Sequence, residues 1–418
     1  MALPCSVDLP PLDPTRAFAA RAAGIPGSPI DRSIALMRSE RAHIVSFAIG
    51  APAPSAIPAA DFGRIAAELL TDDSALNYGP TEGETDLRDA ILEQHALLDG
   101  PRSGDEFLVT AGGTQGIDLV AKLFVDRGDL VVAESPTYAN GVAIVTSYEG
   151  EVLRCPVDGD GMMVDEIPAL ARQAGRRPKL IYVIPNFQNP GGATLSLSRR
   201  HRLLALAETC DALILEDDPY GLLHYDAPPP PTLYTLDGGR GRVIAVRTFS
   251  KILAPGLRAG WVMAPPAVIR AFVAARQGMD TCTNVLGQRM IAAYLRGGAL
   301  AAHLARLRAA YRERRDAMLA ALDQQFADVA GVRWTRPGGG AFLWLTLPPS
   351  VSGDALAAAA LAEGVACVPG SAFVGPSEPD KALRLCFTHP DADAIIEGVR
   401  RLRRAYDGVL SKTRSPGP

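Results

Sequence analysis

The feature that most constrains the fold is an alternation of apolar runs with amphipathic stretches between residues 61 and 296. Seven runs are short and rich in Val, Ile and Leu, as strands are; they read EFLVT, LVVAE, EVLRC, LIYVIP, ALILED, RVIAVRT and AGWVMA. Helix-like stretches such as GIDLVAKLFVD, residues 165–174 and LSLSRRHRLLALAETC lie between them. Strands that alternate with helices form mostly parallel sheets covered by helices. The sequence therefore predicts an α/β fold, with a large domain built on a mostly parallel seven-stranded sheet.

A different pattern follows residue 296. Residues 300–326 predict one long charged helix, and the strand-like runs FLWLTL, ACVPG and ALRLCF come after it. This pattern indicates a smaller α+β domain. Residues 1–45 are rich in Pro and Ala and predict an arm that leads into a short helix around Ile30 to Glu40. The expected organisation is an N-terminal arm with the first part of the small domain in residues 1–45, the large domain in 46–300 and the C-terminal small domain in 301–418.

Charge and cysteine usage exclude several classes of protein. Lys and Arg number 42 and Asp and Glu 46, a net charge of −4 that favours neither nucleic acid nor an anionic membrane as a partner. No apolar run reaches the ~18 residues of a membrane span. The six cysteines are scattered, without metal-ligand spacing, and read as reduced thiols. We therefore expect a cytoplasmic protein that binds a small molecule and no metal.

Lys251 is the first candidate for chemistry. It lies in RTFSKILAPGLRAGW, in a turn that follows an apolar strand, among small and apolar residues. Desolvation there would lower the pKa of the ammonium group, and such a lysine can form an imine with a carbonyl cofactor. A surface lysine at a strand end is the plainer interpretation of this segment alone.

Polar residues also follow two other predicted strands. ILEDDPY ends a strand with Glu216, Asp217 and Asp218, at the sheet edge where open α/β folds bind ligands. A carboxylate there could hold the ring nitrogen of pyridoxal phosphate, although such acids are often helix caps. VIPNFQNPGG ends another strand with Asn186 and Asn189, whose amides could bond a phenolate oxygen or simply form a turn.

A glycine-rich turn supplies a candidate anion site. In FLVTAGGTQGIDLV a strand leads through Gly112 and Gly113 to Thr114 and a helix, whose first N–H groups could bind a phosphate. Capping alone would also explain a Gly-Gly turn. Tyr138, in ESPTYAN, could stack on an aromatic cofactor or serve only in packing.

Taken in order, the segments NYGPTEG, AGGTQG, SPTY, PNFQNPGG, EDDPY, TFSK with Arg258, and LRLCF resemble the fold-type I, class I/II aminotransferases that use pyridoxal 5'-phosphate. Within them the chain is most similar to the 2-aminoadipate/kynurenine aminotransferase-like group, whose fold also forms the effector domain of MocR-type regulators. The resemblance extends from Phe47 to Pro390. Seven motifs in the same order are specific, whereas each alone is weak.

The resemblance implies roles around the cofactor ring. Lys251 would form the internal aldimine and then move protons as the general base. Asp217 would pair with the pyridine nitrogen, and Asn189 and Tyr220 would bond the phenolate oxygen. Tyr138 would stack on the ring.

The same resemblance implies a phosphate site and a substrate site. Gly113, Thr114, Thr248 and Arg258 would bind the phosphate, and Tyr78 would reach it from the partner subunit of a homodimer with shared active sites. For the substrate, the resemblance implies that Arg384 would bind the α-carboxylate, with Gly50 and Asn189 beside it.

Several segments depart from the family pattern. The asparagine-proline motif continues with Gly191 and Gly192 where Thr-Gly is usual, and residues 281–288 replace a Ser/Pro stretch near the site entrance. Thr388 and His389 stand where Ser or Asn is more common. These departures bear on substrate and reaction subtype rather than on the cofactor.

Three functions compete. The first, and the most common activity for such a set of motifs, is that of an aminotransferase, which moves an amino group between an α-amino acid and a 2-oxo acid. A lyase or synthase would use the same quinonoid for elimination, replacement or carbon–carbon bond formation. A ligand-sensing transcription regulator is set aside, because the roughly 45 Pro-rich residues before the matching region leave no room for a winged helix.

Overall fold

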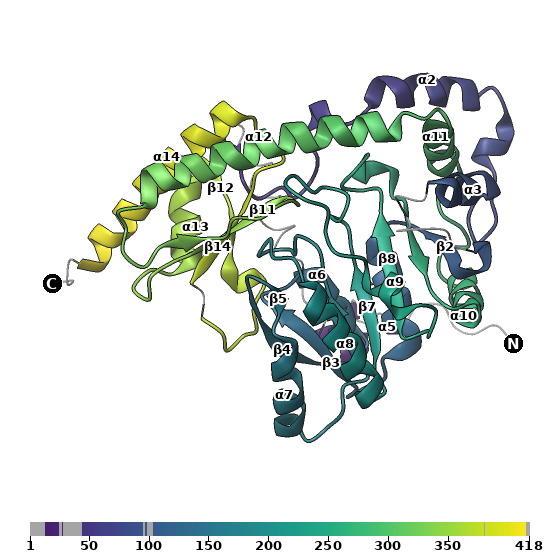
Figure 1. Ribbon diagram of the computed structural model, residues 1–418, viewed down its shortest axis with the longest axis horizontal. Coiled ribbons are helices and arrows are strands. Elements are labelled where there is room, and N and C mark those ends of the chain that lie inside the picture. The colour runs from purple at the N-terminus through teal and green to yellow at the C-terminus, as the bar shows by residue number, and fades with distance from the viewer. Residues whose placement is uncertain are drawn as a thin grey trace, which may run out of the picture.

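The computed structural model describes residues 13–24, 27, 44–94, 97, 103–379 and 381–414. The helix predicted around Ile30 to Glu40 lies outside these residues. Figure 1 shows a large sheet flanked by helices and a smaller sheet beside it, with the long helix α12 running across both. The α-helices are α2 (Ala59–Leu69), α3 (Thr85–Glu93), α5 (Gly113–Phe124), α6 (Ala139–Ser147), α7 (Ile167–Ala174), α8 (Leu197–Cys210), α9 (Leu233–Asp237), α10 (Pro266–Gln277), α11 (Val285–Arg296), α12 (Leu300–Phe326), α13 (Gly353–Ala362) and α14 (Ala392–Arg414).

The large sheet has eight strands in the order β2-β9-β8-β7-β6-β3-β4-β5. They are β2 (Phe107–Thr110), β3 (Leu130–Ser135), β4 (Glu151–Asp158), β5 (Gly161–Met162), β6 (Leu180–Val183), β7 (Leu213–Asp217), β8 (Val243–Thr248) and β9 (Gly260–Met263). All seven predicted strands are present, and the central pairs are parallel. The eighth strand, β5, is only two residues long and pairs antiparallel with β4. It is too short to appear as an apolar run in the sequence, and it was not predicted.

Strand β9 is antiparallel to both of its neighbours. A parallel return would need a crossover of about a dozen residues or more, usually a helix. Only residues 249–259 separate β8 from β9, and they contain no more than a short 3-10 turn, Pro255–Leu257. The chain therefore turns back at once, and this turn carries Lys251.

The sheet separates two apolar cores. Along β6, Leu180 and Tyr182 face one core while Ile181 and Val183 face the other, as the two-residue period of a strand requires. Helix α5 covers the first face, and α8 covers the second. Burial on both faces explains why these strands read as continuous apolar runs.

The smaller sheet has the order β10-β11-β14-β13 and is entirely antiparallel. Its strands are β10 (Arg333–Trp334), β11 (Phe342–Thr346), β13 (Val368–Pro369) and β14 (Ala382–Cys386), and α12 packs along α14 beside it. Near the start of the described chain, β1 (Val45–Ser46) pairs with β12 (Val365–Ala366). The domain bounds at residues 46, 300 and 301 stay a prediction.

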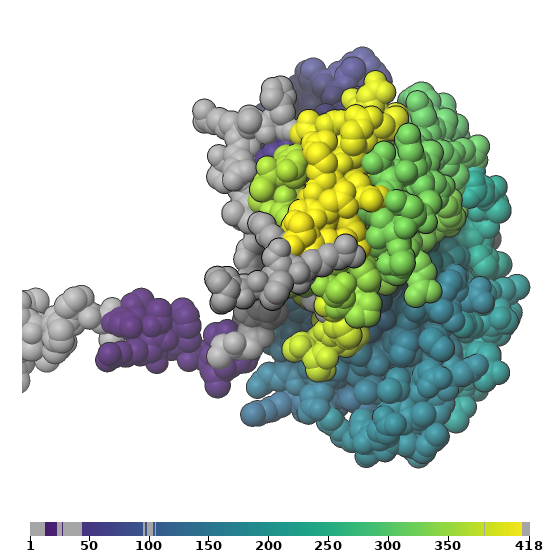
Figure 2. All heavy atoms as spheres, turned by 90° about the vertical axis from the view of Figure 1, so that its left-hand side faces the viewer, coloured from purple at the N-terminus to yellow at the C-terminus, as the bar shows by residue number. Residues whose placement is uncertain are grey.

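Two surface features complete the fold. Residues 13–21 are all exposed, Phe18 to 67%, and Figure 2 shows this part of the chain standing away from the body. In the described ranges, none of the helices has both the length and the apolarity needed to cross a bilayer.

Candidate active site

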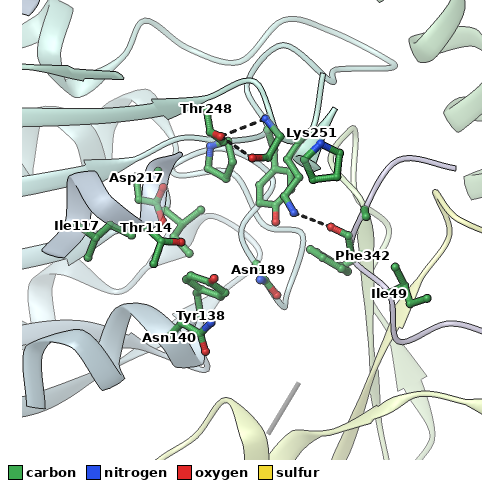
Figure 3. A pocket seen from close by; sticks show the side chains of 18 of the residues that line it. Ile49, Thr114, Ile117, Tyr138, Asn140, Asn189, Asp217, Thr248, Lys251 and Phe342 are labelled. Carbon is green, nitrogen blue, oxygen red and sulfur yellow. Dashed lines mark hydrogen bonds between the residues drawn. The ribbon is translucent and has the colours of Figure 1, made fainter. Parts of the chain in front are cut away.

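A cavity of about 270 Å³ lies where the parallel strands end and the smaller sheet meets them. Eleven of the twelve predicted site residues line it, and Figure 3 shows Thr114, Tyr138, Asn189, Asp217 and Thr248 around the space beside Lys251. They are Gly50, Gly113, Thr114, Tyr138, Asn189, Asp217, Tyr220, Thr248, Lys251, Arg258 and Arg384. Tyr78 is not among the lining residues.

Lys251 lies in the turn after β8, with its side chain in the cavity. Its Nζ donates to the carbonyl oxygen of Gly50 at 2.6 Å. Burial lowers the pKa of the Lys251 ammonium group to about 8, because the surroundings disfavour the charged form. A larger share of this lysine than of an ordinary one is therefore the neutral, nucleophilic amine near neutral pH.

Asp217 ends β7 and is the one acid of the Glu216–Asp218 run that lines the cavity. Burial raises the pKa of its carboxyl to about 6, while a 2.8 Å hydrogen bond from the Tyr182 hydroxyl acts in the opposite direction. Glu216 instead accepts from the backbone N–H groups that begin α9, and Asp218 accepts from Asn186 at 2.6 Å. Neighbouring side chains along a strand point to opposite faces, so Asp217 lies on the other side from Glu216 and Asp218.

The start of α5 faces the cavity together with polar side chains from β8 and its turn. Gly112 has a φ of +84°, and a Cβ there would lie 2.7 Å from Nη2 of Arg258. Thr248 donates to the Ser250 hydroxyl at 2.8 Å, and both line the cavity with Arg258 and Thr114. Helix N–H groups, hydroxyls and a guanidinium form an anion site. Our sequence reasoning missed Ser250, although it stands next to the lysine in TFSK.

Tyr138 lies two residues after the cis peptide bond Ser135–Pro136, and Asn189 is the residue before the cis bond to Pro190. Tyr138 is the N-cap residue of α6, and it lines the cavity together with Thr114 and Asn140. Asn140 was not predicted. Asn186 and Asn189 were both candidates for bonding the phenolate oxygen, and only Asn189 lines the cavity.

Arg384, in β14, is 2% exposed and lines the cavity. Its Nη1 donates to Asn189 Oδ1 at 3.2 Å and its Nη2 to the carbonyl oxygen of Ala48 at 2.7 Å. The guanidinium lies 4.3 Å from the ring centroid of Phe342, a cavity-lining residue that the sequence did not single out. None of the described residues accepts from its buried Nε.

The segment with Gly50 is fastened to the smaller sheet through its carbonyl groups. Phe47 accepts from the backbone of Cys386 at 2.8 Å, and Ala51 accepts from the Thr388 hydroxyl at 3.3 Å. Thr388 therefore helps to hold this segment in place. A Cβ on Gly50 would lie 2.7 Å from the Phe342 ring, so any other residue there would force that ring to move.

Tyr78 is 84% exposed, in the loop before α3. The unusual segment 281–288 anchors that loop: Gln288 accepts from the backbone N–H of Glu84 at 2.8 Å, and Thr283 accepts from Arg276 at 2.6 Å. The segment therefore supports the loop that carries Tyr78.

The cavity fits pyridoxal phosphate chemically. It combines a poorly solvated lysine amine, a buried carboxylate, an anion site at a helix start and a half-buried tyrosine ring. The first two suit the aldehyde and the ring nitrogen, and the anion site suits the phosphate. The separate Arg384, whose guanidinium lines the cavity, suits a carboxylate.

Comparisons with known proteins agree with this chemistry. The family described as "Aminotransferase class I and II" matches residues 43–402. Aromatic-amino-acid aminotransferase 1 of Thermococcus litoralis is 40% identical over 412 residues, 97% of this chain and 98% of that protein.

Two solved structures extend the likeness to the whole fold. Pyrococcus horikoshii kynurenine aminotransferase is 37% identical with a TM-score of 0.88, covering 96% of this chain and 99% of that one. LysN, the alpha-aminoadipate aminotransferase of Thermus thermophilus, complexed with N-(5'-phosphopyridoxyl)-L-leucine, is 36% identical with a TM-score of 0.88 and coverage of 96% and 100%. With its fold, its cavity and these relatives in agreement, the chain belongs to the class I and II aminotransferases, fold-type I enzymes that use pyridoxal phosphate.

Proposed function

We propose that the enzyme transfers the amino group of an apolar or aromatic α-amino acid to a 2-oxo acid, with Lys251 as the proton carrier. The observation that carries this proposal is the grouping of Lys251, Asp217 and Arg384 around one cavity. It unites an amine, a carboxylate and a carboxylate-binding guanidinium around one space.

Bound pyridoxal phosphate supplies an aldehyde for covalent attachment to an amine and a ring that accepts electrons. Lys251 would hold the cofactor through its amine and, once the substrate amine has replaced it, would take a proton from the substrate Cα and return it as a general base and acid. Arg384 fixes the α-carboxylate, so that the Cα–H bond is held within reach of the amine. Asp217 would keep a proton on the ring nitrogen, while Asn189 and Tyr220 would bond the phenolate oxygen.

The phosphate would be held by Gly113, Thr114, Thr248 and Arg258, and Ser250 joins them by its position. Tyr138 would pack against the ring, as it lies half-buried at the cavity wall. These contacts would hold the cofactor by groups that take no part in the reaction. The proton can therefore move at Cα without loss of the cofactor.

Apolar side chains support the substrate class. Ile49, Ala51, Ile117 and Phe342 line the cavity along with Tyr138, and Figure 3 shows Ile49 and Phe342 on the side opposite Ile117. Such walls favour an apolar or aromatic group over a second carboxylate. The relatives named for aromatic amino acids and for kynurenine also agree with this class.

The substrate proposal is tested by mixing the enzyme with one amino acid at a time and without a 2-oxo acid. We expect phenylalanine, tyrosine or leucine to convert the cofactor to pyridoxamine phosphate in one turnover, and aspartate to do so far more slowly. Retention of the aldehyde form during product release would contradict transamination. A preference for aspartate or 2-aminoadipate would contradict the substrate class alone.

We further propose a homodimer with shared sites, located in the cytoplasm. Tyr78, Leu76 and Leu70 are 84%, 69% and 49% exposed, an apolar group suited to cover by a second copy. The five described cysteines are all unpaired, in keeping with a reducing compartment.

Mixed subunits test the shared site. A Tyr78→Phe chain and a Lys251→Ala chain should each be impaired alone, and their heterodimer should regain one intact site out of two. A strictly monomeric active enzyme, or no recovery on mixing, would contradict the proposal.

A further inference from the structure

Tyr182 brings a phenol into an otherwise apolar strand. All four residues of β6 are buried, and Tyr182 is 1% exposed. An unpaired hydroxyl at such a depth is unfavourable, so a buried tyrosine needs a partner. The partner is Asp217 on the adjacent strand β7, whose Oδ2 accepts from Tyr182 at 2.8 Å.

The surroundings leave room for this contact through a missing side chain. Gly141, in the first turn of α6, lies over Tyr182, and a Cβ there would be 2.6 Å from both Cζ and the hydroxyl oxygen. Every other residue at position 141 would displace the phenol. Three elements, β6, β7 and α6, therefore form the contact.

Tyr182 reaches Asp217 from outside the cavity. Asp217 lines the cavity and Tyr182 does not, so the Tyr182 hydroxyl donates to Oδ2 from the side of the carboxylate that faces the protein core. The other oxygen, Oδ1, is then available to a group in the cavity. A donor fixed on one oxygen also limits rotation of the carboxylate.

The hydrogen bond favours the ionised form of Asp217. Burial raises the pKa of this carboxyl, and the Tyr182 hydroxyl lowers it because an O–H donor stabilises the anion. Asp218 adds to the upward shift, while Arg247 and Lys251 oppose it. Burial raises the pKa of the nearby Glu134 to about 8, so Glu134 carries little charge at neutral pH.

We propose that Tyr182 is a positioning residue for the cofactor, which holds the Asp217 carboxylate ionised and oriented toward the ring nitrogen. The inference rests on the proposed role of Asp217 and extends it to a side chain that does not touch the cofactor. Tyr182→Phe removes the hydroxyl and retains the ring and its packing.

Cofactor affinity gives a readout independent of catalysis. Titration of the cofactor-free protein with pyridoxal phosphate should show about tenfold weaker binding for Tyr182→Phe at pH 7, the order of one hydrogen bond to a charged group. The fall in affinity toward acid pH should also begin at a higher pH than in the wild type, because Asp217 protonates more readily.

Tyr225→Phe is the matched control, since Tyr225 is a buried phenol whose hydroxyl donates to a backbone carbonyl, that of Gly340. We expect it to alter stability but neither cofactor affinity nor its pH midpoint. The double variant Tyr182→Phe/Asp217→Asn should bind no more weakly than Asp217→Asn, because both act through one contact.

Two results would overturn the proposal: wild-type affinity and pH midpoint in Tyr182→Phe, or an equal loss in the Asp217→Asn background, which would make the effect merely structural. If Asp217→Asn itself binds the cofactor as tightly as the wild type, the proposed role of Asp217 fails instead. The two failures are therefore distinguishable.

Discussion

Replacement of Arg384 by lysine should separate substrate binding from cofactor binding. The arginine uses Nη1 and Nη2 to reach Asn189 and the Ala48 carbonyl, while its buried Nε has no acceptor among the described residues. Lysine would keep the charge but lose the planar fork that binds a carboxylate through two hydrogen bonds. Loss of such a buried contact costs about 2–5 kcal/mol, roughly 30-fold to several thousand-fold in the dissociation constant of the amino acid.

The assay is a titration of the loaded enzyme with an amino acid, followed by the change in cofactor absorbance, beside a titration of the cofactor-free protein with pyridoxal phosphate. Arg314→Lys is the matched control, because Arg314 donates to the Thr388 carbonyl at 2.5 Å and does not line the cavity. We expect the control to bind both ligands as the wild type does. Unchanged amino-acid affinity in Arg384→Lys would refute the reasoning, and an equal loss of cofactor affinity would indicate general damage to the site.

Three further predictions follow from the same geometry. The pKa of Asp217 is raised from 3.8 to about 6 in the folded protein, so its burial costs stability as the pH rises through that window. Cofactor-free Asp217→Asn should escape this loss, which two pKa units put at about 3 kcal/mol in total and at about 2 kcal/mol between pH 4.5 and 7.5. Urea unfolding at these two pH values measures it, and an equal pH dependence in both proteins would contradict it. Gly50→Ala should weaken amino-acid binding by displacing Phe342, and Phe342→Leu should restore part of it; wild-type binding in Gly50→Ala alone would exclude the clash. Attachment of pyridoxal phosphate to the cofactor-free enzyme should accelerate with pH around a midpoint near 8, set by Lys251, whereas a midpoint near 10.5 would show a solvated lysine.

The strands of the large sheet could be predicted because both of its faces are buried. Each central strand then reads as an apolar run, and the turn residues mark its end. β5 could not be predicted, because two residues at an edge bury too little to leave a pattern. The direction of β9 follows from a short connection, which the sequence does show.

The candidate site could be assembled from motifs because each lies directly after a strand. Which of several neighbouring polar residues faces the cavity could not be predicted, because it depends on the direction in which each side chain points. Asn186 turns away to Asp218, while Asn189 faces the cavity. Tyr182 looked like an ordinary core residue, since its partner lies 35 positions away on another strand. The role of Tyr78 depends on a second copy and stays a prediction.

The most direct test of the account is to locate the cofactor on the chain. Borohydride reduction of the loaded enzyme, followed by proteolysis and mass spectrometry, should place the pyridoxyl group on Lys251 alone. Lys251→Ala should yield no labelled peptide under the same treatment. A label on any other lysine would contradict the assignment of the whole site.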